Sequence, residues 1–409
     1  MENSINIQKK KGFFQRMAEL FFMIYMITLY IFVDRGDTLI ISQLAFIAFT
    51  GLTIIVILQK QRIHLGKNVM VVYFAFAWMF ASYFWAKNEY VAWMSAKTIW
   101  KLFLLLFLTY NLFAEEENAH EFLIKSLYVA GVSLLIYSVY IYGLGEVIDM
   151  MTGNRELRLG SEINQENSFG MMNATTCMVT FYYLLYRKRF KLFHIVVLAL
   201  AFLFAMSSGS KKALFAICIG VLFLVYKKYG IRKVYKIVAI VAILSLVFVS
   251  VMQLPVFETI NHRMEQMMEQ FSGKNSGDGS TGVRMRMIDR GCELYKERLL
   301  TGFGANNYRI VTGFRTYAHN NFIEVLVDFG LIGFFLYYLI YWQVLKNLWN
   351  MMSDAGKALL CVFLTRLMME IAMVSYFDKI HWIMFAFFMI DSTKSQTESA
   401  LEKNEGISD

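Results

Sequence analysis

Proline and cysteine are scarce in this chain. Pro255 is the single proline among 409 residues, and only four cysteines occur. Three of the cysteines fall within apolar runs and the fourth stands alone in a loop, so the chain has neither a disulfide framework nor a zinc spacing. Charged residues make up 17% of the chain against 57% hydrophobic residues, which excludes an ordinary soluble domain.

Motifs of nucleotide chemistry are absent as well. The sequence has no Asp-x-Asp pair of the kind that holds a metal–nucleotide complex, and it has no glycine-rich P-loop. It also lacks the Gly-x-Ser-x-Gly turn that carries a serine nucleophile. These absences argue against an enzyme that uses a soluble nucleotide-activated substrate, and the sequence offers no candidate metal or cofactor site.

Apolar runs, by contrast, recur along nearly the whole chain. Most are about 17–22 residues long, which is enough to cross a hydrocarbon core of roughly 30 Å. The sequence therefore predicts an all-α polytopic membrane protein, with a single transmembrane domain over residues 1–391. The expected spans, about twelve in number, are 17–33, 38–58, 69–86, 97–113, 122–143, 168–186, 192–207, 213–226, 237–254, 321–343, 358–376 and 380–391.

Lysine and arginine give the chain a formal charge of +9, and their placement indicates a topology. If every apolar run crosses once, the basic clusters at 60–67, 187–191 and 227–236 lie on one side. Loops rich in Lys and Arg face the cytoplasm, so both termini are expected there, and no nucleic-acid partner is needed to explain the charge. No cleavage site follows the first run, so we expect it to remain as an anchor.

Two loops on the outer side are long enough to hold structure, over residues 144–167 and 255–320. The second loop lies between the ninth and tenth expected spans. Its helical spacing of apolar residues predicts an amphipathic helix, followed by a glycine-rich hinge over 273–282 and a second helix over about 283–298. The acidic tail over 392–409 is predicted to be disordered.

Polar residues gather where the second loop re-enters an apolar run. His319 and two asparagines are followed by Glu324 and Asp328 on the first turns of the expected span. Ionised groups cost several kcal/mol to bury unpaired, so such residues at a membrane edge form a functional site by default. A neutral imidazole accepts a proton near neutral pH, so His319 is a candidate general base that Glu324 orients; the alternative is an interfacial histidine without chemistry. Asn320 or Asn321 either caps the helix or binds an acceptor.

Seven basic residues stand outside the cytoplasmic pattern: Lys211 and Lys212 at the outer end of an apolar run, Arg284, Arg286 and Arg290 in the large loop, and Arg155 and Arg158 in the smaller one. A loop charge is usually solvated surface, and Lys211 can equally be an interfacial anchor. A diphosphate leaving group, however, needs fixed cationic donors when no metal ion balances its charge. Inside the membrane, Arg366 and Glu370 are four residues apart and are expected to form a structural ion pair.

The pattern His-Asn-x-x-x-Glu-x-x-x-Asp-x-Gly-x-x-Gly, which begins at His319, resembles the signature of the O-antigen ligase/polymerase superfamily. Upstream, Arg284 followed by the turn 302–304 resembles the family's arginine, short helix and Gly-x-Gly turn. Ser-Gly-Ser-Lys211 resembles a Ser-Arg element with lysine in place of arginine, and Arg158-Leu159-Gly160 resembles a further element before the sixth span. The family's tryptophan and proline near positions 288 and 299 are absent here.

This resemblance implies a metal-independent, inverting membrane glycosyltransferase that needs no cofactor. Its donor would be a glycan carried on undecaprenyl diphosphate at the outer face of the bacterial cytoplasmic membrane. By the same resemblance, Arg284, Lys211 and Arg158 hold the diphosphate, while His319 deprotonates or orients the acceptor hydroxyl. The partners that it implies are the lipid-linked oligosaccharide, the bilayer, a flippase and a chain-length regulator.

Three functions are compatible with these features. The first is a polymerase that joins lipid-linked repeat units into capsule, exopolysaccharide or O-antigen chains. The second is a ligase that moves finished glycan to lipid A–core or another acceptor. Abundant Lys, Ile, Asn and Phe indicate an AT-rich genome and favour a Gram-positive cell, which has no lipid A–core, so polymerase is the first choice. The third, a lipid-linked glycan flippase, predicts paired repeats and midplane charges, and the sequence shows neither.

Overall fold

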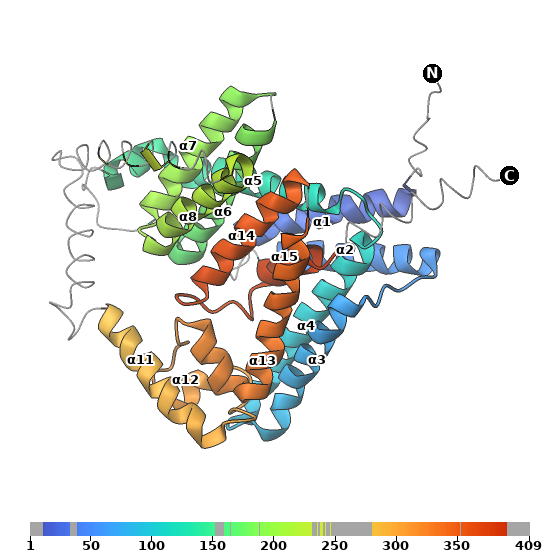
Figure 1. The fold of residues 1–409 in the computed structure, drawn as a ribbon, viewed down its shortest axis with the longest axis vertical. Helices are drawn as coiled ribbons and strands as arrows, with labels where there is room; N and C mark the ends of the chain where they lie inside the picture. The colour runs from blue at the N-terminus through green and yellow to red at the C-terminus, as the bar shows by residue number, and fades with distance from the viewer. Residues whose placement is uncertain are drawn as a thin grey trace.

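The computed structural model describes residues 11–32, 39–151, 159–163, 165–187, 189–230, 280–351 and 353–390, and five single positions between 235 and 246. Within these residues the protein is all helical, with thirteen α-helices, two short 3-10 helices and no β-strand (Figure 1). The expected all-α class is confirmed for this part of the chain.

The first half of the chain forms long apolar helices. Their interiors contain no proline, which would remove a backbone hydrogen bond from the helix. One of them, α5, is interrupted at Gly143, whose φ is 67°. Asn88 caps one of them, because its side chain accepts a hydrogen bond from the Val91 N–H at 3.0 Å. These helices are α1 (Phe13–Ile31), α2 (Leu39–Lys60), α3 (Lys67–Ala81) with its 3-10 extension η1 (Ser82–Trp85), α4 (Glu89–Phe113) and α5 (Ala119–Met151).

The second half mixes long helices with short ones. The turn between α7 and α8 contains Gly209, whose positive φ of 60° lets the chain reverse there. The helices are α6 (Glu166–Tyr186), α7 (Lys191–Ser207), α8 (Lys211–Tyr229), α11 (Ser280–Leu294), the 3-10 helix η3 (Tyr295–Arg298), α12 (Tyr308–Val311), α13 (Asn321–Trp349), α14 (Asp354–Met369) and α15 (Lys379–Phe388).

Five of the described helices are long and apolar enough to cross a membrane, namely α1, α2, α4, α5 and α13. Three shorter apolar segments are Val69–Trp85, α7 and α15. The chain is thus a multi-pass membrane protein. The count of twelve spans, the placement of the loops between them and the orientation of the termini stay predictions.

Some expected segments lie outside the described residues. They are most of the run 237–254, the loop 255–320 as far as residue 279 and the tail 392–409. The run expected over 358–376 is helical only as far as Met369. The chain leaves the helix there because the Glu370 carbonyl accepts a hydrogen bond from the Asn321 N–H at 2.8 Å, which ties this turn to the start of α13.

Helices from distant parts of the chain meet around α13. In Figure 1, α3, α4 and α13 run side by side, and α11 and α12 lie against the end where the chain enters α13. Helix α14 packs against α8 and α13, and α15 packs against α4. The first turns of α13 are therefore approached by the outer loop on one side and by the α14–α15 connection on the other.

Two hydrophobic clusters hold these helices together. The larger one extends through α1 to α8 and α13 to α15. The smaller one, called the outer cluster below, joins α11 and α12 to the first half of α13. Its buried members are Met287, Leu294, Phe303, Tyr308, Ala318 and Val327.

Helix α13 is broken at Gly330, which has φ 65° and ψ −169°. Glycine adopts this conformation without the strain that a side chain would bring. Because of the break, the carbonyls of Val327 and Asp328 do not continue the helical ladder. They accept hydrogen bonds from the N–H groups of Phe303 and Gly304, both at 2.8 Å.

The segment 299–304 completes the other side of the break. The N–H groups of Leu331 and Ile332 donate to the carbonyls of Leu299 and Leu300 at 2.8 and 3.3 Å. A Cβ at Gly330 would lie 2.3 Å from the Leu300 oxygen, so glycine is also needed for the close approach. The carbonyls at the end of the first segment of α13, residues 321–329, are consequently bonded to the segment 299–304 rather than to the next turn of their own helix.

Candidate active site

His319 lies on the loop immediately before α13. Its backbone is in the left-handed region, with φ 54°. Its ring packs against Tyr317, with 4.2 Å between the ring centroids. The Nδ1 atom is buried and has no hydrogen-bond partner among the described residues. The imidazole is therefore held by ring packing and by its backbone, and its nitrogen is left available.

The charge state of His319 follows from its surroundings. Burial, followed by the positive charges of Arg284 and Lys212, lowers the pKa of His319 to about 4. The imidazole is therefore neutral at pH 7 and has a lone pair that accepts a proton. Two cations from different helices, Arg284 of α11 and Lys212 of α8, thus act electrostatically on the ring.

Lys212, and not the predicted Lys211, is the lysine that faces His319. Its side chain is partly buried and donates a hydrogen bond to the Ala372 carbonyl, in the α14–α15 connection. Lys211 is exposed. Consecutive residues of a helix point about 100° apart, so the two side chains lie on different faces of α8. The sequence marked the pair, but it held no signal to choose between them.

The third predicted cation, Arg158, lies outside the described residues, but its neighbours do not. The Leu159 N–H donates to the Ser207 carbonyl at 3.0 Å, and the Gly160 N–H donates to the Tyr142 hydroxyl at 3.1 Å. Position 159 thus sits at the end of α7, beside the turn that leads into α8. The arrangement brings Leu159 and Gly160 to the same end of the molecule as Lys212.

Glu324 holds the backbone beside His319. Its carboxylate, 2% exposed, accepts a hydrogen bond from the Ala318 N–H, and Arg309 lies close enough to interact with its charge. No hydrogen bond joins it to the His319 ring among the described residues. Glu324 therefore fixes the chain in front of the histidine. Arg309, on the short helix α12, carried no recognisable sequence signal.

Asp328 is fully buried one turn further along α13. Its Oδ1 accepts from the Tyr308 N–H at 2.7 Å, and its Oδ2 accepts from the Asn306 N–H at 2.9 Å and from the Tyr376 hydroxyl at 2.5 Å. Three donors satisfy a buried carboxylate without a cation. Asp328 thus bonds the outer loop and the α14–α15 connection to one point of α13.

The two asparagines, Asn320 and Asn321, have different roles at the start of α13. Asn320 is the N-cap of α13, because its Oδ1 accepts from the Ile323 N–H at 3.1 Å. Asn321 is buried, accepts from the Ser375 N–H at 3.0 Å and donates to the Tyr338 hydroxyl at 3.1 Å. Neither side chain is placed here as a free acceptor-binding group.

Backbone strain is concentrated in this loop. Five described non-glycine residues have positive φ, and three of them are Asn306, Arg315 and His319. Such a conformation costs on the order of 1–2 kcal/mol per residue and persists only where the surroundings enforce it. The hydrogen bonds that Asp328 accepts from Asn306 and Tyr308, and that Glu324 accepts from Ala318, hold the two sides of the loop in place.

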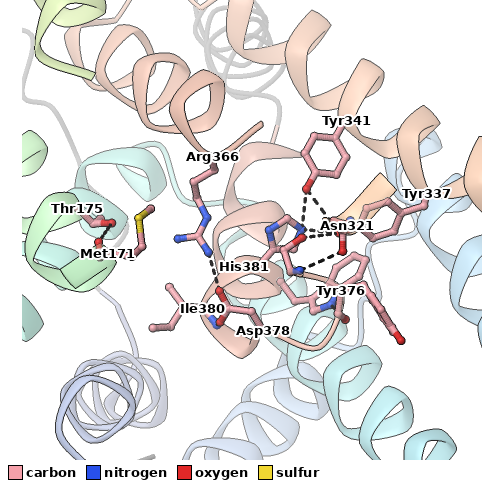
Figure 2. Close-up of polar contacts among 12 residues, drawn as sticks. Met171, Thr175, Asn321, Tyr337, Tyr341, Arg366, Tyr376, Asp378, Ile380 and His381 are labelled. Carbon is pink, nitrogen blue, oxygen red and sulfur yellow. Dashed lines mark hydrogen bonds and ion pairs between the residues drawn. The ribbon is translucent and has the colours of Figure 1, made fainter. Parts of the chain in front are cut away.

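A buried polar network lies below this site, between α13 and α15 (Figure 2). The Tyr337 hydroxyl is 2.9 Å from Ser375 Oγ and 3.3 Å from His381 Nε2. The predicted Arg366–Glu370 ion pair is wrong, because Arg366 pairs instead with Asp378 at 2.6 Å. Asp378 lies on the connection that folds back over α14, a placement that spacing within one helix does not reveal.

Part of the chain that carries this site matches a known protein family. Residues 194–338 match the model of a family described as O-antigen ligase. This stretch is an O-antigen ligase domain. It contains Lys212, Arg284, His319 and Glu324, and the resemblance seen in the sequence is confirmed. No curated protein matches the chain.

Over the matched residues, the chain is similar to a family of membrane proteins of polysaccharide synthesis. The O-antigen ligase domain begins in α7 and ends within α13, so it includes the cations of α8 and α11 and the loop that carries His319. Among the described residues, no three His, Cys, Asp or Glu side chains are grouped as metal ligands. The groups that the site does bring together are a neutral imidazole and two cations.

Proposed function

We propose that this protein is a polymerase that joins lipid-linked repeat units into a polysaccharide chain. The observation that carries the proposal is that the positive charges of Arg284 and Lys212 both act on the neutral ring of His319, which lies on the loop before α13. A glycosyl transfer from a lipid diphosphate needs a base for the acceptor hydroxyl and positive charge for the leaving diphosphate. The O-antigen ligase domain provides the family context in which both groups act on glycans.

The proposed step is a single displacement. The acceptor hydroxyl oxygen attacks the anomeric carbon of the donor sugar as His319 takes the hydroxyl proton. The bond from that carbon to the diphosphate oxygen breaks, and its electron pair leaves on the undecaprenyl diphosphate. Attack from the face opposite the diphosphate inverts the anomeric centre.

Each residue has a separate role in this proposal. Arg284 and Lys212 bind the diphosphate and stabilise its growing charge. Glu324 positions His319 through the Ala318 backbone, and Asn320 caps the helix behind it. Arg158 stays a proposed third cation on the strength of the sequence pattern and of the position of Leu159.

A ligase is the second candidate, because the matching family is described by that activity. Polymerase and ligase differ in the acceptor, which is a second lipid-linked unit in one case and another envelope molecule in the other. His319 and the two cations act on the donor side and on a hydroxyl, so they serve both reactions equally.

The experiment that separates the functions measures the length and the lipid attachment of envelope glycans in a strain without this gene. A single repeat unit left on undecaprenyl diphosphate is the result expected for a polymerase. Long chains left on undecaprenyl diphosphate would mean a ligase. Units trapped in the cytoplasmic leaflet would mean a flippase and would contradict both enzyme proposals.

A further inference from the structure

We infer that Tyr308 is a positioning residue, which sets where Arg284 stands relative to His319 and thereby determines how tightly the lipid diphosphate is bound. The inference rests on the proposed function. Tyr308 lies in the outer cluster, and in this proposal it acts on the diphosphate through Arg284.

Tyr308 connects two elements of the site by its two ends. Its backbone N–H donates to Asp328 Oδ1 at 2.7 Å, which ties it to the first half of α13. Its hydroxyl donates to the Met287 carbonyl at 2.6 Å, which ties it to α11. The side chain is completely buried between them. Met287 is three residues, or nearly one helical turn, from Arg284.

Gly291 provides a second contact on the same side of α11. A Cβ at this position would lie 2.4 Å from Ile323 Cγ2 and 3.2 Å from Tyr308 Cε2. Gly291 is four residues from Met287, so both lie on one helix face. Gly291 lets α11 approach α13. The hydrogen bond from the Tyr308 hydroxyl then fixes the position of α11 along and around the axis of α11.

The other end of this link does not depend on α11. Asp328 is also bonded to Asn306 and Tyr376, and the chain before His319 is held by Glu324. Loss of the Tyr308 hydroxyl would therefore leave His319 in place and remove one of the contacts that fix the position of α11. Arg284 would then move relative to the imidazole.

Such a movement has a specific consequence for binding. A guanidinium group recognises phosphate oxygens through hydrogen bonds of fixed direction, so a small displacement weakens it more than it would weaken a point charge. We expect the loss in affinity to appear only while Arg284 is present. A tyrosine that merely filled the outer cluster would weaken the fold without this dependence on Arg284.

The test uses the full-length protein in lipid nanodiscs with undecaprenyl diphosphate as the ligand. Dissociation constants are measured for the wild type, Tyr308→Phe, Arg284→Ala and the double variant. We expect Tyr308→Phe to raise Kd about fivefold, the size of one lost hydrogen bond, and to have no further effect in the Arg284→Ala protein. An unchanged Kd, or the same fivefold effect without Arg284, would overturn the inference.

Two further variants complete the design. Tyr295→Phe removes a hydroxyl from another tyrosine that packs against the outer cluster, and it should leave Kd unchanged. Gly291→Ala keeps the Tyr308 hydroxyl but pushes α11 away from Ile323, so it should raise Kd only when Arg284 is present; it replaces Tyr308→Phe if that protein does not fold. A wild type that binds no undecaprenyl diphosphate would contradict the proposed function itself.

Discussion

Two regions of this protein are held together by different forces. In the helices α1, α4 and α15, aromatic rings pack on one another: Phe22 lies 5.3 Å from Phe113 and 5.6 Å from Phe387 between centroids. At the start of α13, hydrogen bonds from backbone amides to the buried carboxylates of Glu324 and Asp328 are added to the apolar packing of the outer cluster.

The difference is one of precision. Ring packing is stabilising over a range of distances and angles, so it holds helices together while allowing small shifts. A hydrogen bond to a carboxylate weakens steeply with angle and fixes the atoms that make it. The region that must hold a base and two cations in register is the one that uses directional bonds.

The largest expected effect comes from removing the proposed base. His319→Ala should lower the rate of chain growth by about 10²–10⁴-fold, the usual contribution of general-base catalysis. Because Ala318 and Asn320 still hold the backbone, membrane insertion and the amount of protein should not change. Polymer of normal length from this variant, measured by gel electrophoresis of envelope glycans, would contradict the assigned role.

One substitution in each region shows whether the hydrogen-bonded region or the ring-packed region loses more stability. Asp328→Asn places an NH₂ group against donors that need an acceptor, and it should destabilise the outer region by about 1–3 kcal/mol. Phe22→Leu in the ring-packed region should cost about 1 kcal/mol, because a hydrophobic side chain of similar volume remains. Thermal unfolding of the detergent-solubilised variants measures both, and a larger loss for Phe22→Leu would reverse the comparison.

Arg284→Lys tests whether the direction of the hydrogen bonds matters at the cationic side of the site. Lysine keeps the charge but cannot make two parallel hydrogen bonds to phosphate. We expect KM for the lipid-linked donor to rise about tenfold, by roughly the strength of one charge-assisted hydrogen bond. Wild-type turnover with lysine at this position would remove the argument for a guanidinium.

The two adjacent lysines offer a matched pair. Lys212→Ala removes a charge that acts on His319, whereas Lys211→Ala changes an exposed side chain on the same turn of α8. We expect Lys212→Ala to raise the donor KM about fivefold, in line with a partly screened charge, and Lys211→Ala to raise it less. Equal effects of the two substitutions on the donor KM in a kinetic assay would mean that Lys211 also holds the diphosphate, as the sequence predicted.

The smallest expected effect is a shift in a pH profile. His319 must be neutral to accept a proton, so kcat/KM of the wild type should fall only as the pH drops through about 4. Arg284→Ala removes a positive charge that lowers this pKa, so the acid limb should move toward neutral pH. An unmoved limb would mean that another group controls it.

Much of this architecture could be predicted because it depends on local composition. Long apolar runs without proline form helices wherever they occur, and α1, α2, α4 and α5 lie close to their expected ranges. The His319–Asn320 motif was also recognisable, since asparagine caps a helix through its own neighbours. These features need only residues within a few positions of one another.

Other features depend on partners far away along the chain. The choice of Lys212 over Lys211 follows from how α8 packs, and the partner of Arg366 follows from the turn that brings Asp378 back over α14. Glu324 was expected to touch the imidazole, yet it bonds to the amide before it. Periodicity within a single helix contains no information about these pairings.

The sequence by itself determined an all-helical membrane chain with a polar motif at the head of α13. Local hydrophobicity and capping act before any tertiary contact forms. Only the tertiary structure decided which cations stand beside His319 and what holds them there. The reason is that α13 is broken at Gly330, and the segment 299–304 makes the hydrogen bonds that the helix lacks there. The site is therefore assembled by hydrogen bonds between segments that are far apart along the chain.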